Sequence, residues 1–327
     1  MRVAQRALRI EPFHVMEVAK AARALDRSTG HDRPPMLYLN IGEPDFTAPP
    51  LVVQAGERAL REGRTQYLPA LGLESLRERL SQWYRDRFGL SVPARRIVIT
   101  AGASAALQLA CLALIEAGDE VLMPDPSYPC NRQFVQAAQG QAVLLPCEAA
   151  QRYQLSAAQV REHWGAHTRG VLLASPSNPT GTSMAASELR EIHQVVSQHG
   201  GITMVDEIYL GLSFDAAYGQ SALALGEDII SINSFSKYFN MTGWRLGWMV
   251  VPNAYVREFE KLSQNIYLSA PTPSQHAALA AFEPATIAIL EARRAEFEAR
   301  RDYLVPALRA LGFDERFRRM WRYYLAY

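Results

Sequence analysis

Several features that would mark other classes of protein are scarce in this chain of 327 residues. It has only three cysteines, Cys111, Cys130 and Cys147, and because they form no CxxC pair, neither a disulfide framework nor a zinc knuckle is predicted. The formal net charge is +1, from 34 Lys and Arg against 33 Asp and Glu, which provides no overall field for holding a polyanion. We therefore expect buried thiols in a reducing compartment and no nucleic-acid partner.

Long apolar runs are also lacking. No stretch approaches the roughly 18 apolar residues of a membrane span, and the N-terminal MRVAQRALRIEPF has no uninterrupted apolar core of the kind found in signal peptides. The sequence therefore predicts a cytoplasmic protein with no membrane partner. The turn at residues 101–106 has no GxGxxG motif, which argues against a nicotinamide dinucleotide site.

A metal site is not predicted either. His163 and His167 have the i, i+4 spacing of a metal-binding pair, but Gly165 lies between them and neither an HExxH motif nor a third ligand accompanies them. Surface histidines are the better interpretation.

What the sequence does contain is an alternation of two patterns, which begins at about residue 95. Short β-branched runs alternate with longer segments of helical period, as is typical of a mostly parallel sheet covered by helices. Strands are predicted at 97–100, 121–123, 142–145, 171–174, 202–205, 229–233 and 246–251. Helices are predicted between them at 104–117, 130–138, 156–164 and 187–199. The last two strands are too close for a crossover that carries a helix, so the final strand is predicted to be antiparallel.

The flanks of this block predict a second, smaller α/β domain built from both chain ends. Residues 34–50 are expected to be extended, and helices are predicted at 51–62, 72–88, 254–268 and 285–311. We expect residues 49–252 to form the large domain. The small domain is predicted to comprise residues 1–48 and 253–327. The fold class is therefore α/β, with a seven-stranded sheet sandwiched by helices.

Chemically informative residues follow the predicted strands, where α/β proteins gather their ligands. The small residues 101–106 open a helix whose free N–H groups favour a phosphate, although a purely structural turn is the alternative. Tyr128 can stack on a flat ligand or pack in the core, and Asn178 offers an amide donor. Asp206 ends a buried strand, so it needs a partner such as a protonated ring nitrogen, unless it caps a helix.

The segment SFSKYFNMTGWRLGW, residues 234–248, carries two cations. Lys237 lies among apolar and hydroxyl neighbours near a fixed charge, so it loses its proton more easily, as an imine-forming amine must. Arg245, planar and always charged, suits a phosphate dianion. Either residue alone is more often on the surface. Together, the strand-end residues describe a ligand with a phosphate, a flat ring with a basic nitrogen, a ring oxygen and an aldehyde, which is pyridoxal 5'-phosphate.

On a set of specific motifs the sequence resembles the class I and II aminotransferases, pyridoxal-phosphate enzymes of fold type I, from about residue 10 to about residue 312. These motifs are IGEPDF from Ile41, Tyr67 in TQYLPALGLESLR, AGAS from Ala101, DPSYP from Asp125, SNPTG from Ser177, DEIY from Asp206, SFSK from Ser234 and GWRLG from Gly243. The resemblance implies transfer of an amino group from an α-amino acid to a 2-oxo acid. It also implies a ping-pong mechanism through a Schiff base at Lys237.

The resemblance also implies a role for each site residue. Lys237 bonds to the cofactor and shuttles the proton at the substrate Cα, while Asp206 keeps the ring nitrogen protonated. Asn178 and Tyr209 bind the ring oxygen, and Tyr128 stacks on the ring. The phosphate is held by Arg245, Ser234, Ser236, Ser104 and the amides near Ala103. Gly42, with Asn178, contacts the substrate. Tyr67 reaches the phosphate of a neighbouring subunit, which implies a homodimer with shared sites.

One departure from the family pattern concerns the end of the chain. Family members continue for several dozen residues beyond the helix equivalent to 285–311, and an arginine there binds the substrate carboxylate. No position here matches that arginine, so the resemblance implies a C-terminally truncated small domain in which cofactor binding survives better than turnover. A pyridoxal-phosphate lyase of the same fold, such as a C–S lyase, and a non-catalytic cofactor-binding protein stay open as alternatives.

Overall fold

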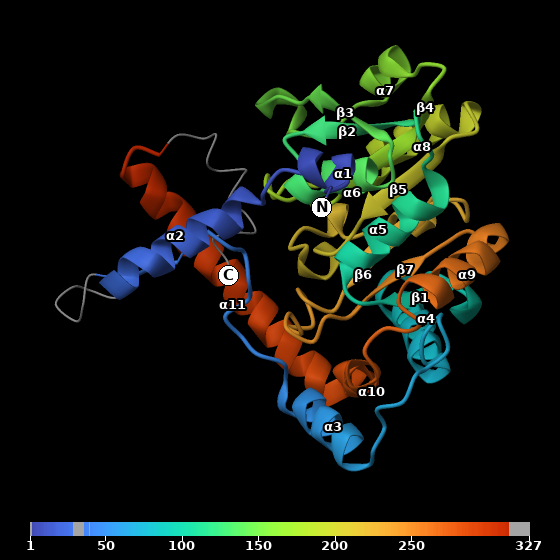
Figure 1. Cartoon of the computed structure of the whole chain (residues 1–327). Coiled ribbons are helices and arrows are strands. Elements are labelled where there is room, and N and C mark those ends of the chain that lie inside the picture. Colours follow the sequence, from blue (N-terminus) through green and yellow to red (C-terminus); the bar gives the residue numbers. More distant parts are fainter. Residues whose placement is uncertain (1, 29–35, 39, 314–327) are drawn as a thin grey trace.

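The computed structural model describes residues 2–28, 36–38 and 40–313, and Figure 1 shows their arrangement. Residues 314–327, the last part of the predicted small domain, lie outside the described residues. None of the helices in the described ranges combines the length and the apolar character that a membrane-crossing helix needs.

A seven-stranded sheet forms the centre of the structure, and each strand falls at a predicted position. The strand order is β1-β7-β6-β5-β4-β2-β3, and β7 is antiparallel to both of its neighbours whereas the other pairs are parallel. This confirms the mostly parallel sheet and the antiparallel final strand. The strands are β1 (Ile97–Thr100), β2 (Glu120–Asp125), β3 (Gln141–Pro146), β4 (Thr168–Ala174), β5 (Ile202–Asp206), β6 (Ile230–Ser234) and β7 (Gly247–Val250).

The reversal between β6 and β7 determines where the functional edge lies. After β6 the chain turns back at once, and the Phe235 amide donates to the Leu246 carbonyl at 3.0 Å. Ser234 consequently pairs with Gly247, and Gly247 also pairs with Thr100 on β1. The start of β7 therefore lies at the same edge as the carboxyl ends of β1 and β6.

Alternation along the strands explains how helices cover both faces of the sheet. In β1, Ile97 and Ile99 contribute to one hydrophobic cluster while Val98 contributes to another on the opposite face. The predicted helices are present as α3 (Pro50–Arg61), α4 (Glu74–Phe88), α5 (Ala103–Leu114), α6 (Pro129–Ala137), α7 (Ala157–His163), α8 (Ala186–Gln198), α9 (Val256–Ile266) and α11 (Pro284–Ala310).

Three α-helices within the described ranges were not predicted: α1 (Gln5–Arg9), α2 (His14–Ser28) and α10 (Thr272–Leu279). The described residues of the segment predicted to be extended, 36–38 and 40–49, contain neither helix nor strand. This segment contacts the long helix α11, the orange-red helix that runs from the upper left to the lower centre of Figure 1. Arg300 forms an ion pair with Asp45 at 3.0 Å, and the rings of Phe46 and Phe297 lie 5.4 Å apart.

Candidate active site

A cavity of about 580 Å³ opens at the carboxyl edge of the sheet. It brings together every predicted site residue except Tyr67, whose side chain lies elsewhere and is 81% exposed. The predicted residues that line the cavity are Gly42, Ala103, Ser104, Tyr128, Asn178, Asp206, Tyr209, Ser234, Ser236, Lys237 and Arg245.

Lys237 projects its amine into this cavity from the turn that follows β6. Its Nζ donates a hydrogen bond to the carbonyl of Gly42 at 2.6 Å and lies 5.5 Å from the centre of the Tyr209 ring. Burial lowers the pKa of Lys237 to about 8; the Glu43 carboxylate opposes this shift, and the Arg245 guanidinium adds to it. About a tenth of this lysine is therefore an uncharged, nucleophilic amine at pH 7, far more than for an ordinary lysine.

This lowered pKa predicts how the cofactor-free protein reacts with an amine reagent. Because only the uncharged amine reacts, acylation of Lys237 should rise with pH to a midpoint near 8 and level off above it. Peptide mass spectrometry after brief acetic anhydride treatment between pH 6 and 11 measures this, with the exposed Lys20 and Lys261 as internal monitors of reagent decay. Labelling of Lys237 that begins only above pH 10 would contradict the prediction.

Asp206 places a buried carboxyl group at the end of β5. It is 5% exposed, and its Oδ1 accepts a hydrogen bond from the Ile208 amide at 3.2 Å. Burial raises the pKa of Asp206 to about 7, an effect that the Ile208 amide partly opposes. Tyr209 occupies the N-cap position of the next short helix, Leu210–Leu212, so Asp206 is not a helix cap. A cationic partner would stabilise the ionised form of this buried carboxyl group.

The neighbouring Glu207, 2% exposed, was missed by sequence reasoning and has a different role. Its carboxylate accepts hydrogen bonds from the Ser221 hydroxyl, the Ala222 amide and the Ser231 hydroxyl. Asn233 donates in turn to the Ser231 hydroxyl at 2.9 Å. Glu207 therefore has its own partners and joins the loop after β5 to strand β6. The sequence signal for it was the second acidic residue of the DEIY motif.

A tight turn between β1 and α5 adjoins the Arg245 side chain. Gly102 has φ +86°, and a Cβ there would lie 2.6 Å from Arg245 Nη2, so only glycine fits. A Cβ on Gly247 would lie 2.8 Å from the Ala103 amide nitrogen. The guanidinium and the free amides at the start of α5 are thus held close together. A helix N-terminus beside a guanidinium suits a phosphate dianion.

One wall of the cavity is aromatic and apolar. Tyr128, which precedes α6, lines it and is not a core residue; its ring meets that of Phe13 edge to face, with centroids 5.9 Å apart. Phe13, Val15 and Met16 also line the cavity, although sequence reasoning missed them. Val15 and Met16 belong to α2, a helix that was not predicted, and Phe13 directly precedes it.

The chemistry of these groups fits pyridoxal phosphate. The cavity combines an anion-binding turn with a guanidinium, a lysine amine of lowered pKa and a buried carboxyl group, beside an aromatic wall. Among the described residues, no cluster of three or more His, Cys, Asp or Glu is placed to hold a metal ion.

Comparison with known proteins agrees with this site. The family model for class I and II aminotransferases matches residues 34–316. The chain is 37% identical over 314 residues to a valine–pyruvate aminotransferase of Mycobacterium tuberculosis, covering 96% of this chain and 79% of that protein. It is 34% identical over 315 residues to a (5-formylfuran-3-yl)methyl phosphate transaminase of Methanocaldococcus jannaschii, covering 95% and 80%.

Solved structures show the same relationship. A crystal structure of an aminotransferase from Mycobacterium tuberculosis matches with a TM-score of 0.90 at 37% identity, covering 96% of this chain and 80% of that one. The aspartate aminotransferase of Thermus thermophilus with maleate matches with a TM-score of 0.90 at 30% identity, covering 96% and 82%. The family resemblance, the fold and the cofactor inferred from the sequence are thereby confirmed. The chain belongs to the class I and II aminotransferases, enzymes that use pyridoxal phosphate.

Proposed function

We propose that the cavity at the carboxyl edge of the sheet is where this aminotransferase moves an amino group from an α-amino acid to a 2-oxo acid. The observation that carries the proposal is the meeting of Lys237, Asp206 and Arg245 in one cavity, although Asp206 ends β5 and the two cations belong to the later segment between β6 and β7. When bound, pyridoxal phosphate supplies an aldehyde that takes up an amine and a protonated ring that draws electrons from the substrate.

In this proposal the residues around the tight turn orient the cofactor. Arg245, the hydroxyls of Ser104, Ser234 and Ser236, and the amide of Ala103 bind the phosphate. Asn178 and Tyr209 donate hydrogen bonds to the ring oxygen, and Tyr128 packs against the ring face. The support is that all of these residues line the same cavity.

Two titratable groups do the proton chemistry in this proposal. The Lys237 amine, with its lowered pKa, removes a proton from the substrate Cα and would deliver it to the carbon that the cofactor aldehyde supplies. The Asp206 carboxylate holds the proton on the ring nitrogen. The positively charged ring nitrogen in turn stabilises the ionised form of Asp206, which burial alone disfavours. Gly42, whose carbonyl contacts Lys237, is proposed to contact the substrate carboxylate. Asn178 is proposed as the second residue that contacts the substrate.

Half-reactions test the function directly. With an amino acid alone, the visible absorption of the bound cofactor should fall while one equivalent of 2-oxo acid appears and no ammonia is released. Adding a different 2-oxo acid should restore the absorption and yield its amino acid. Valine and aspartate as donors and pyruvate as acceptor come first because relatives carry those names, and 2-oxoglutarate is tested as a second acceptor. Ammonia release would indicate a lyase, and an unchanged spectrum with every donor would indicate a protein that only binds the cofactor.

We also propose that residues 1–48 and 253–327 form a small domain beside a large domain of residues 49–252. The support within the described ranges is direct contact between the two ends of the chain. The Arg293 guanidinium donates to the Thr47 carbonyl at 2.6 Å, and Arg300 pairs with Asp45.

A homodimer in the cytoplasm completes the proposal. Its support is the position of Tyr67, whose side chain is 81% exposed and does not line the cavity of its own chain. Such a residue is free to contribute its hydroxyl to the phosphate site of a second copy. Sedimentation of the cofactor-loaded protein measures this assembly.

A further inference from the structure

The loop that carries Asn178 is held in place by hydrogen bonds with residues that do not line the cavity. Residues 175–185 join β4 to α8 and contain neither helix nor strand. Within the loop, the Ser177 amide donates to the Thr182 carbonyl at 2.8 Å, and the Met184 amide donates to the Ser175 hydroxyl at 3.0 Å. Asn178 lies at the tip of this turn and lines the cavity.

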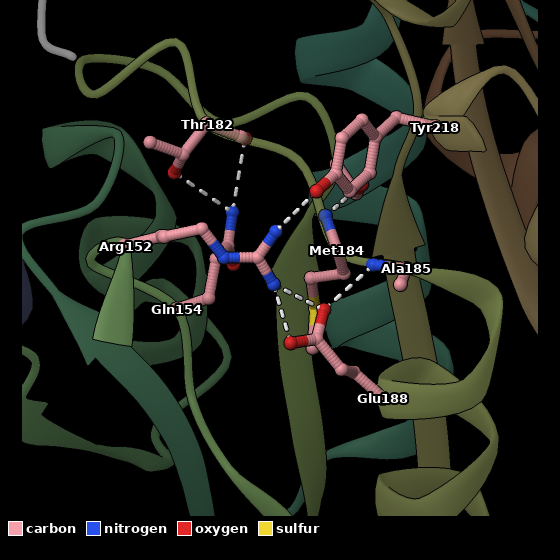
Figure 2. A network of polar contacts seen from close by, with 8 residues as sticks. Arg152, Gln154, Thr182, Met184, Ala185, Glu188 and Tyr218 are labelled. Carbon is pink, nitrogen blue, oxygen red and sulfur yellow. Dashed lines mark hydrogen bonds and ion pairs between the residues drawn. The ribbon is translucent and has the colours of Figure 1, made fainter. Parts of the chain in front are cut away.

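Gln154 joins the two arms of this loop. It is 3% exposed and does not line the cavity. Its Nε2 donates to the carbonyl and hydroxyl of Thr182 at 3.0 and 3.3 Å (Figure 2). It also donates to the Ala174 carbonyl at 3.3 Å. Ala174 ends β4 and Thr182 lies on the returning arm, so one buried amide group ties the loop to the rigid sheet. Leaving those acceptors without a donor would carry a desolvation cost.

Arg152, two residues before Gln154, fixes the far end of the same loop. Its guanidinium pairs with both carboxylate oxygens of Glu188 and donates to the Tyr218 hydroxyl at 2.7 Å (Figure 2). Glu188 Oε2 also accepts a hydrogen bond from the Ala185 amide at 2.7 Å. One guanidinium nitrogen, Nη2, contacts both carboxylate oxygens, and Nη1 holds the Tyr218 hydroxyl, so these charge-assisted contacts set the position at which the loop enters α8.

We propose that Gln154, supported by the Arg152–Glu188 pair, is a positioning residue that holds residues 175–185 so that the Asn178 amide is presented to the ring oxygen of the cofactor. The inference rests on the proposed role of Asn178 in the transfer reaction. A donor that binds the ionised oxygen favours that form and lowers the pH at which the oxygen loses its proton. A loop held less firmly should weaken this bond without any change in the residues that touch the cofactor.

The test is the pH titration of the visible absorption of the bound cofactor. Gln154→Leu should raise the midpoint by about 0.5 to 1 unit and weaken cofactor affinity about three- to tenfold, because one charge-assisted hydrogen bond is loosened. In an Asn178→Ala background, Gln154→Leu should add no further shift, since the bond through which it acts is already absent. Gln198→Leu, at the exposed end of α8, is the matched control and should titrate as the native protein does.

The outcomes separate this proposal from the function itself. A native midpoint in Gln154→Leu, or a shift of equal size in the Asn178→Ala background, would overturn the positioning role while leaving the function intact. If Gln154→Leu does not fold, Arg152→Lys provides the same reading, because it keeps the charge, but a single ammonium group cannot hold Glu188 and the Tyr218 hydroxyl as the two guanidinium nitrogens do. A native chain that binds no pyridoxal phosphate would instead refute the proposed function, and this inference with it.

Discussion

Lys237→Ala is expected to abolish the covalent attachment of pyridoxal phosphate. Borohydride treatment of the native, cofactor-loaded protein should fix one equivalent of cofactor on the peptide that contains Lys237, and the variant should carry none. The physical reason is that this amine, with a pKa lowered to about 8, lines the cavity beside the phosphate-binding turn. Non-covalent cofactor can still bind the variant, since Arg245 remains. Intact-mass and peptide mass spectrometry measure the result.

The chain contains few lysines, so the site of covalent attachment can be assigned without ambiguity. The whole sequence contains three lysines, Lys20, Lys237 and Lys261. Lys20 and Lys261 lie on exposed helix surfaces and pair with Glu17 and Glu258. Lys20→Ala and Lys261→Ala should therefore keep the full covalent yield. A fixed cofactor that persists in Lys237→Ala, on either remaining lysine, would remove the basis for the proposed active site.

The strands were predictable because strands that are buried on both faces consist of short, nearly continuous apolar runs. In β1 and β7 every residue is buried, and the corresponding runs consist largely of apolar and β-branched residues. The antiparallel direction of β7 followed from the distance along the chain between it and β6. The order of the strands was not predictable, because neighbours such as β1 and β7 are about 150 residues apart in sequence and no local pattern encodes their pairing.

The site was predictable to the extent that each residue directly follows a strand. Asp206, Ser234 and Asn178 end or follow β5, β6 and β4, so the parallel sheet brings them to one edge. Tyr67 has no such anchor, and its predicted contact with a second subunit stays a prediction.

Other residues in and around the site could not be predicted from the sequence, because their roles depend on tertiary contacts. Gln154 is an ordinary glutamine until the fold places its amide against the backbone of the Asn178 loop. Phe13 likewise becomes a wall of the cavity only because its ring packs against Tyr128. Neither position belongs to a motif or to a predicted helix or strand.

Asp206→Asn is expected to lower the rate of the amino-acid half-reaction by about 10²- to 10⁴-fold, the range typical of a group that acts on a proton in the reaction. The carboxylate is proposed to hold the proton on the ring nitrogen, and an uncharged amide cannot stabilise that cation. Cofactor affinity should fall by about tenfold or less, because the phosphate contacts proposed for Arg245 do not involve Asp206. Single-turnover absorption measurements separate the two effects.

Glu207→Gln is the matched control for this substitution, because it makes the same acid-to-amide change at the neighbouring buried acidic residue. Glu207 accepts hydrogen bonds from Ser221, Ala222 and Ser231, and a glutamine amide cannot accept all of them, so unfolding should become easier by about 1 to 3 kcal/mol. Its half-reaction rate should stay near that of the native enzyme, since Glu207 does not line the cavity. If both variants lost rate equally, the effect would come from general disturbance of this loop, and the specific role of Asp206 would have to be abandoned.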